Sequence, residues 1–409
     1  MNVELVTLSN GIRVIHQEDV HSTVSHIGLF INVGSREEKP EERGIAHFLE
    51  HVLFKGTKRR KAFHILSRLD VVGGELNAYT TKEETVVYAS VLNHHIDRAA
   101  EIIADISFNS TFPEKELTKE KEVVVDEIAS YKDAPSELIF EDFDRLLFGT
   151  HPLGNDILGN EKEVLSITKE KIQEFVARHY QPQNMVLAVV GNIKLSLLVK
   201  KLEKYFGKYA QGSIITERIA PTKVHQFSEQ LLRNNHQSHM IIGGAACAYA
   251  DPDKAGLILL NNYLGGPGLN SRLNMEVREK HGYAYHIESS VHNYQDSGVF
   301  AVYFASDKKY INKTKKIVLR ELDRICTLPL SPLKLHQAKE QLKGFIALGM
   351  ESNSGLMLGL GKSFLMSDRV ESVEESLEKI DSLTSDQLLE IANKYLHPSK
   401  MSELTYTSK

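Results

Sequence analysis

Residues 112–128 read FPEKELTKEKEVVVDEI, and residues 331–346 read SPLKLHQAKEQLKGFI. In both segments a proline stands where the first turn of a helix is expected, and the two segments align on that proline. The elements around them also follow one order in each half of the chain, a strand, then helices, then two strands and further helices. A repeat of roughly 220 residues predicts two copies of one α/β domain. The alternative is that α/β proteins share such an order by chance.

The expected elements follow from hydrophobic periodicity and turn residues. In the first half we expect strands at 12–16, 24–33, 76–81 and 85–92, and helices at 45–55, 62–71, 96–108 and 113–131. In the second half we expect strands at 237–246, 285–291 and 298–305, and helices at 255–264, 271–280, 311–326 and from 332 onward.

The predicted fold class is α+β, with two homologous α/β sandwich domains that each consist of a mostly antiparallel sheet covered by helices. We expect the domains at 1–210 and 224–409. The polar segment 211–223, which contains Pro221, is the natural linker between them.

Composition narrows the class of protein. Of the 409 residues, 42% are hydrophobic and 25% are charged, which is typical of globular proteins. The net charge of −5 and the lack of long basic runs argue against a nucleic-acid partner. We see no signal peptide and no apolar stretch that could span a membrane. The two cysteines, far apart in sequence, suggest no disulfide framework, so a reducing, cytoplasmic setting is expected.

One motif could hold a metal ion, in the segment RGIAHFLEHVLFKGT at residues 43–57. In a helix, His47 and His51 lie one turn apart and point the same way, so their two imidazoles can bind one Zn²⁺. Glu50 lies on the same side and could take a proton from a metal-activated water, as in the H-x-x-E-H motif. With 18 histidines in the chain, this spacing arises by chance in roughly 1 in 15 such sequences. A helix with a solvated polar stripe is therefore the alternative.

A catalytic zinc needs a third protein ligand and an open position. The helix expected after Pro113 offers two carboxylates beside its buried side, Glu120 and Glu127, which are two turns apart and share one stripe. One of them could bind the metal while the other accepts a hydrogen bond from the free ring N–H of a ligating histidine. The residue pattern alone leaves both assignments open.

Three segments resemble the insulinase/pitrilysin family of zinc peptidases: HFLEHVLFKGT, GGELNAYTTKEETVVYA and EKEVVVDEI. The likeness is strongest to its short-chain branch, which contains mitochondrial processing peptidase and bacterial processing proteases. It implies a third ligand 76 residues after His51, which is Glu127, and a supporting Glu seven residues earlier, which is Glu120. It further implies a zinc metallopeptidase that holds one Zn²⁺ per chain on His47, His51 and Glu127. In that family the residue at Glu50 acts as general base.

The resemblance also implies contacts to a peptide substrate. The segment GGELNAYT looks like the family's edge strand, where an extended peptide adds as a further strand, and Asn77 and Ala78 match the positions that hold the substrate backbone. The segment SRLNMEVREKHGYAYHIES resembles one in which an Arg and a Tyr seven residues apart position the substrate. Arg278 and Tyr285 match that pair, whereas Asn274 stands where the family usually has Phe. A surface arginine and a core tyrosine are the alternatives.

The second half lacks H-x-x-E-H, and Ile346 occupies the repeat position of Glu127, so we expect a non-catalytic domain that contributes to a substrate chamber. By resemblance the chain forms a homodimer that encloses unfolded peptides, with Arg278 and Tyr285 acting on the active site of the other chain. The main alternative is a non-catalytic or partner-dependent subunit of a processing-peptidase-like complex, and another is an enzyme devoted to one peptide. Nucleotide binding at LGGPGLNSR is disfavoured because the phosphate-loop ending is missing.

Overall fold

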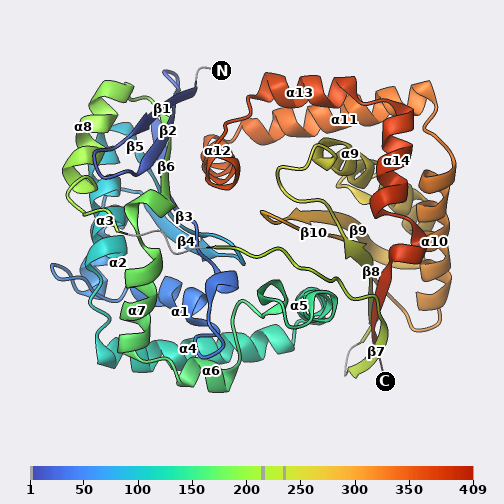
Figure 1. The fold of residues 1–409 in the computed structure, drawn as a ribbon, viewed down its shortest axis with the longest axis horizontal. Coiled ribbons are helices and arrows are strands. Elements are labelled where there is room, and N and C mark those ends of the chain that lie inside the picture. The colour runs from blue at the N-terminus through green and yellow to red at the C-terminus, as the bar shows by residue number, and fades with distance from the viewer. Residues whose placement is uncertain (1–2, 213–216, 234–235, 409) are drawn as a thin grey trace. The chain divides into compact units, whose positions relative to one another are not determined.

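The computed structural model describes residues 3–212, 217–233 and 236–408, and shows two β-sheets covered by helices (Figure 1). Residues 213–216 of the predicted linker lie outside the described residues.

Sheet 1 belongs to the first half of the chain and has the strand order β1-β2-β6-β3-β5-β4. Strands β2 and β6 are parallel, and the other neighbouring pairs are antiparallel. Its strands are β1 (Val3–Thr7), β2 (Arg13–Glu18), β3 (Val24–Ile31), β4 (Glu75–Thr80), β5 (Thr85–Leu92) and β6 (Met185–Gly191).

Sheet 2 repeats this topology with the order β7-β11-β8-β10-β9, in which β7 and β11 form the parallel pair. Its strands are β7 (Ser228–Arg233), β8 (Ser238–Ala245), β9 (Ala284–Asn293), β10 (Gly298–Ser306) and β11 (Ser402–Ser408). Strand for strand, this order matches β2-β6-β3-β5-β4 of sheet 1. The duplicated, mostly antiparallel architecture predicted from the sequence is therefore confirmed.

The helices of the first half are α1 (Ile45–Leu53), α2 (Ala62–Asp70), α3 (Ile96–Asn109), α4 (Glu114–Lys132), α5 (Pro135–Phe148), α6 (Glu161–Leu165), α7 (Lys169–His179) and α8 (Leu195–Tyr205). Those of the second half are α9 (Lys254–Gly265), α10 (Ile311–Thr327), α11 (Pro332–Met350), α12 (Asn353–Ser367), α13 (Val373–Ser382) and α14 (Ser385–Tyr395).

Short helical turns complete the chain: η1 (Ser35–Glu37), η2 (Asn93–His95), η3 (Pro152–Gly154), η4 (Pro182–Asn184) and η6 (Pro398–Lys400) are 3₁₀ turns. The helix expected at 271–280 is instead largely a π-helical turn, η5 (Asn274–Glu279). Within the described ranges, no helix combines the length and the apolar composition that spanning a bilayer requires.

The chain divides into two compact units that are not continuous in sequence. Unit 1 comprises Met1–Ala129, Asn155–Arg218 and Leu348–Val370, and unit 2 comprises Ser130–Gly154, Ile219–Ala347 and Glu371–Lys409. The continuous ranges predicted as domains, 1–210 and 224–409, therefore do not coincide with the compact units.

The compact units exchange helices between the two halves of the chain because some strands are apolar on both faces. All residues of β6 are buried, and such a strand needs cover on each side of the sheet. Within unit 1, helix α12 packs Met357 and Phe364 on one face of sheet 1, while the opposite face packs on α1, α2 and α3 (Figure 1). Within unit 2, helix α5 packs Phe143 and Leu147 on sheet 2.

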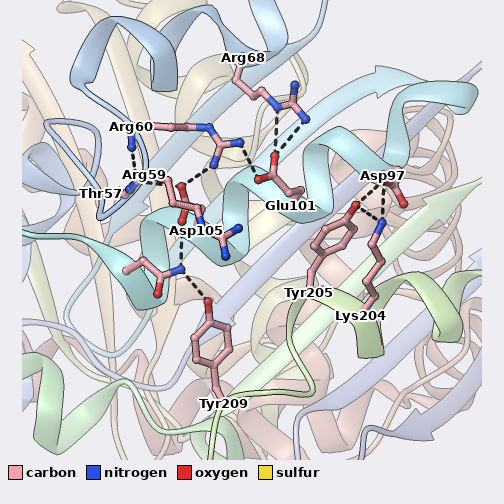
Figure 2. A network of polar contacts seen from close by, with 11 residues as sticks. Thr57, Arg59, Arg60, Arg68, Asp97, Glu101, Asp105, Lys204, Tyr205 and Tyr209 are labelled. Atoms are coloured by element: carbon pink, nitrogen blue, oxygen red, sulfur yellow. Dashed lines mark hydrogen bonds and ion pairs between the residues drawn. The ribbon is translucent and has the colours of Figure 1, made fainter.

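A polar network on α3 fixes the segment that follows α1 (Figure 2). Asp105 is only 4% exposed and accepts hydrogen bonds from Thr57 Oγ1 at 2.9 Å and from Arg60 at 2.6 Å. Its second oxygen accepts a hydrogen bond from Asn109 Nδ2 at 3.0 Å. Arg60 also donates to Glu101 at 2.6 Å. The turn at Thr57 is therefore tied to α3 through a buried carboxylate.

Replacing this carboxylate tests its structural weight. We expect Asp105→Ala to lower the free energy of unfolding by about 2–4 kcal/mol, because Arg60 and Thr57 would lose a buried partner. Asp97 is a control on the same helix: it contacts Lys201, Lys204 and Tyr205, but its side chain is 37% exposed. Asp97→Ala should cost less than about 1 kcal/mol. Urea denaturation followed by circular dichroism measures both, and equal losses would contradict the distinction.

Candidate metal centre

Helix α1 is placed by a buried carboxylate at its start. Glu38 accepts hydrogen bonds from the backbone N–H groups of Gly44 and Ala46, each at 2.9 Å, which satisfies free donors at the helix N-terminus. Gly44 adopts a left-handed φ of 80°, and a Cβ there would lie 2.6 Å from the carbonyl oxygen of Leu158. The backbone can therefore enter α1 in this way only with glycine at position 44.

The apolar side of α1 sets the direction of its histidines. Phe48, Leu49 and Val52 are fully buried in the core of unit 1. His47 and His51 project from the same helix one turn apart, and their ring centroids are 4.8 Å apart with an interplanar angle of 63°. Packing of the apolar residues thus presents both imidazoles together.

Glu127 on α4 meets both imidazoles. Its Oε1 lies 3.6 Å from His47 Nε2, and its Oε2 lies 3.3 Å from His51 Nε2. The ligand atoms that these three residues offer all lie within 4.8 Å of one another. In the part of the chain that the structure describes, this is the one group of at least three His, Cys, Asp or Glu side chains that converges in this way.

The donor set fits a zinc ion. Two imidazole nitrogens and one carboxylate oxygen are ligands that Zn²⁺ takes in catalytic sites, and tetrahedral ligands at about 2.1 Å lie roughly 3.4 Å apart. The separations between Glu127 and the two imidazoles are close to that spacing. The adjacent imidazoles of His47 and then of His51 hold the pKa of Glu127 well below its usual range. Glu127 is therefore a carboxylate at neutral pH, ready to bind a cation.

Glu120 contacts the ring nitrogen of His51 that does not face Glu127. His51 Nδ1 donates a hydrogen bond to Glu120 Oε2 at 3.3 Å, which leaves Nε2 directed toward Glu127. The residue pattern could not choose between Glu120 and Glu127, and the geometry separates them: only Glu127 faces the Nε2 atoms of both histidines. Lys55 was not predicted from the sequence, and its Nζ lies 2.6 Å from Glu120 Oε1. Its spacing of four residues from His51 was the available signal.

Glu50 lies next to this group on α1 and is half-buried. Burial lowers the pKa of the His51 imidazole, but the hydrogen bond with Glu127 and the negative charges of Glu127 and Glu50 outweigh burial, so the pKa of His51 is raised. Glu50 therefore interacts electrostatically with the metal-binding group without being part of it.

The predicted substrate residues fall in two places. In unit 1, Asn77 and Ala78 lie on β4, which is an edge strand of sheet 1 and packs against α1. The backbone N–H of Ala78 donates to the Asn77 side-chain oxygen at 2.9 Å. A side chain thus already occupies a main-chain donor of β4 that an added strand could use.

In unit 2, Arg278 and Tyr285 come together. The guanidinium carbon of Arg278 lies 5.1 Å from the centre of the Tyr285 ring, and Tyr285 is 82% exposed. Both line a cavity of about 560 Å³. Asn274, the departure from the family pattern, also lines it and donates its amide to the carbonyl of Leu269. Ile346 lies on α11 and packs against the core of unit 2.

Comparisons with known proteins agree with this architecture. The family described as Insulinase (Peptidase family M16) matches residues 13–161, and the Peptidase M16 inactive domain matches residues 166–342. The uncharacterized zinc protease YmxG of Bacillus subtilis is 33% identical over 386 residues, which cover 94% of each chain. An uncharacterized zinc protease of Rickettsia felis is 34% identical over 393 residues, covering 96% of this chain and 95% of the relative.

Solved structures share the fold. A peptidase M16 inactive domain from Pseudomonas fluorescens superimposes with a TM-score of 0.94 at 22% identity and covers 100% of this chain and 98% of its own. A protease from Helicobacter pylori does so with a TM-score of 0.90 at 23% identity, covering 99% of each chain. The relatives in these comparisons are named zinc proteases, and they define a class of peptidases with a duplicated α/β fold. Within that class, the chain belongs to the insulinase family, peptidase family M16.

Removing Glu127, the candidate third ligand, tests the metal centre. We expect the wild-type chain to retain one Zn²⁺ after gel filtration, and Glu127→Ala to bind zinc more than ~100-fold more weakly, because two imidazoles alone leave the ion under-coordinated. Glu122→Gln changes an exposed glutamate on the same helix and should leave binding intact. Elemental analysis and chelator competition measure both. Equal zinc content in all three proteins would rule out Glu127 as a ligand.

Proposed function

We propose that this chain is a zinc-dependent metalloendopeptidase that cleaves unfolded peptides. The observation that carries the proposal is the convergence of His47, His51 and Glu127, with Glu50 beside them. Zn²⁺ held there would polarise the scissile carbonyl and make the attacking water more acidic. The relatives named zinc proteases support this assignment of the metal.

The chain's own residues supply the remaining chemistry. The Glu50 carboxylate would accept a proton from the attacking water and deliver it to the leaving amine as the peptide C–N bond breaks. Glu120 would keep His51 in the tautomer whose Nε2 lone pair faces the metal. The free edge of β4 would orient an extended peptide through main-chain hydrogen bonds, in which the amide of Ala78 exchanges the Asn77 side chain for the substrate.

Our proposal includes a homodimer in which two chains enclose the substrate. Unit 2 would then supply substrate contacts through Arg278 and Tyr285, acting on the metal centre of the other chain. Two observations support these separate roles of the two units. The Arg278–Tyr285 pair borders a cavity, and the described residues of unit 2 contain no counterpart of the His47, His51 and Glu127 group. An enclosed site would exclude folded proteins by size.

Glu50→Gln separates metal binding from catalysis. We expect the variant to retain its zinc and to lose at least ~100-fold in kcat, because the amide cannot accept the water proton. Hydrolysis of fluorescently labelled unfolded casein, with zinc measured on the same samples, provides the readout. Equal turnover in both proteins would remove Glu50 from the mechanism. A zinc-loaded wild type that leaves unfolded peptides intact would favour the non-catalytic or partner-dependent subunit instead.

Complementation between two inactive variants tests the homodimer. Chains carrying Glu50→Gln and chains carrying Arg278→Ala should each be impaired alone. When the two are co-expressed with different tags, mixed dimers should regain activity at one of their two sites, which is about a quarter of all sites under random pairing. Such recovery requires Arg278 of one chain to serve Glu50 of the other. A fully active monomer, or an Arg278→Ala variant with wild-type KM, would contradict this part of the proposal.

A further inference from the structure

Lys55 extends the metal group by one more charged residue. Its Nζ lies 2.6 Å from Glu120 Oε1, and the other oxygen of the same carboxylate accepts a hydrogen bond from His51 Nδ1 at 3.3 Å. The Nε2 atom of His51 in turn lies 3.3 Å from Glu127. Lys55, Glu120 and His51 therefore form a continuous line of contacts that ends at the proposed metal position.

The backbone around Lys55 is held on both sides. Its N–H donates to the carbonyl of Val52 at 3.1 Å, which continues the end of α1. The carbonyl of Gly56 accepts a hydrogen bond from the N–H of Thr111 at 3.0 Å, and Thr57 is bound to the buried Asp105 (Figure 2). The position from which the Lys55 side chain reaches Glu120 is thus set by the same network that fixes the turn after α1.

Charge explains why a lysine is needed there. Three carboxylates lie in or beside the metal-binding group, those of Glu50, Glu120 and Glu127, and one divalent cation can balance two of them. Glu120 is only 7% exposed, so water screens its charge poorly, and a buried carboxylate without a partner is strongly unfavourable. Lys55, with a side chain that is 26% exposed, supplies the balancing charge.

The contact also restricts rotation of the carboxylate. With Oε1 held by Lys55, the Glu120 side chain presents Oε2 to His51. Without Lys55 only the single hydrogen bond from His51 would hold this carboxylate, and the imidazole would lose a fixed acceptor. Partners of this kind behind a ligating histidine fix its tautomer and its ring orientation.

We propose that Lys55 is a positioning residue of the metal centre, which acts through Glu120 to hold the Nε2 lone pair of His51 toward the metal. This inference rests on the zinc site proposed above and adds to it a residue outside the ligands and the base. The competing interpretation is an ion pair that merely joins the turn after α1 to α4. Such a pair would change the stability of the metal-free protein and leave its zinc affinity unchanged.

Zinc affinity of the purified full-length chain, measured by competition with a chromophoric chelator, distinguishes the two. We expect Lys55→Met to weaken zinc binding by about 10-fold or more, within the range known for partners of ligating histidines. Lys55→Arg should restore most of the affinity, because it keeps the charge and the donors. Lys58→Met is the matched control: Lys58 is exposed, lies three residues further along the same segment, and should have no effect.

A double variant tests the route through Glu120. If Lys55 acts through this carboxylate, Lys55→Met should cost little additional affinity in a Glu120→Gln background. Losses that add in full would overturn the inference, as would a Lys55→Met variant that binds zinc like the wild type while the metal-free protein unfolds more easily. A wild-type chain that binds no zinc would instead overturn the proposed function, and the inference with it. The two failures are thus distinguishable.

Discussion

The convergence of His47, His51 and Glu127 depends on one constraint, the register between helices α1 and α4. Two imidazoles come from one helix at a spacing that any helix would provide, but the carboxylate of Glu127 arrives from another helix and must stop 3.3–3.6 Å from both Nε2 atoms. A sub-ångström error in that distance matters to a metal ion with ligands at about 2.1 Å. The precision comes from the close-packed core of unit 1, where Val52 and Val124 are fully buried.

Acidic side chains around this core are placed with partners. Glu38 accepts hydrogen bonds from the N-terminus of α1, and Asp105 accepts them from the turn that follows α1. Glu120 contacts His51 and Lys55. Each of these carboxylates is less than a tenth exposed, where an unpaired charge is unfavourable. The pairing makes the surroundings of α1 rigid on both ends, so that the histidines are presented by a fixed helix rather than by a mobile one.

Duplication of the fold has not duplicated the chemistry. Sheets 1 and 2 share their strand order, and β4 and β9 are edge strands in corresponding places. Yet an isoleucine, Ile346, stands in the second half at the repeat position of Glu127 and packs against the core of unit 2. The same architecture thus carries a candidate metal-binding group in one unit and an arginine–tyrosine pair that lines a cavity in the other, because chemistry resides in a few side chains placed on the fold.

The sequence by itself indicated the repeat, many of the strands and helices of each half, and the one-turn spacing of His47 and His51, because helices and strands leave short-range periodic patterns. Strands β1, β7 and β11 were not among the predicted elements. Family resemblance added Glu127 as a ligand at a fixed distance along the chain. Only the tertiary structure decided how Glu120 differs from Glu127, that Lys55 reaches Glu120, and that α5 and α12 cover sheets other than those of their own halves. Periodicity fixes which side chains share one face of a helix, whereas the distance between two helices is set by the packing of the whole core.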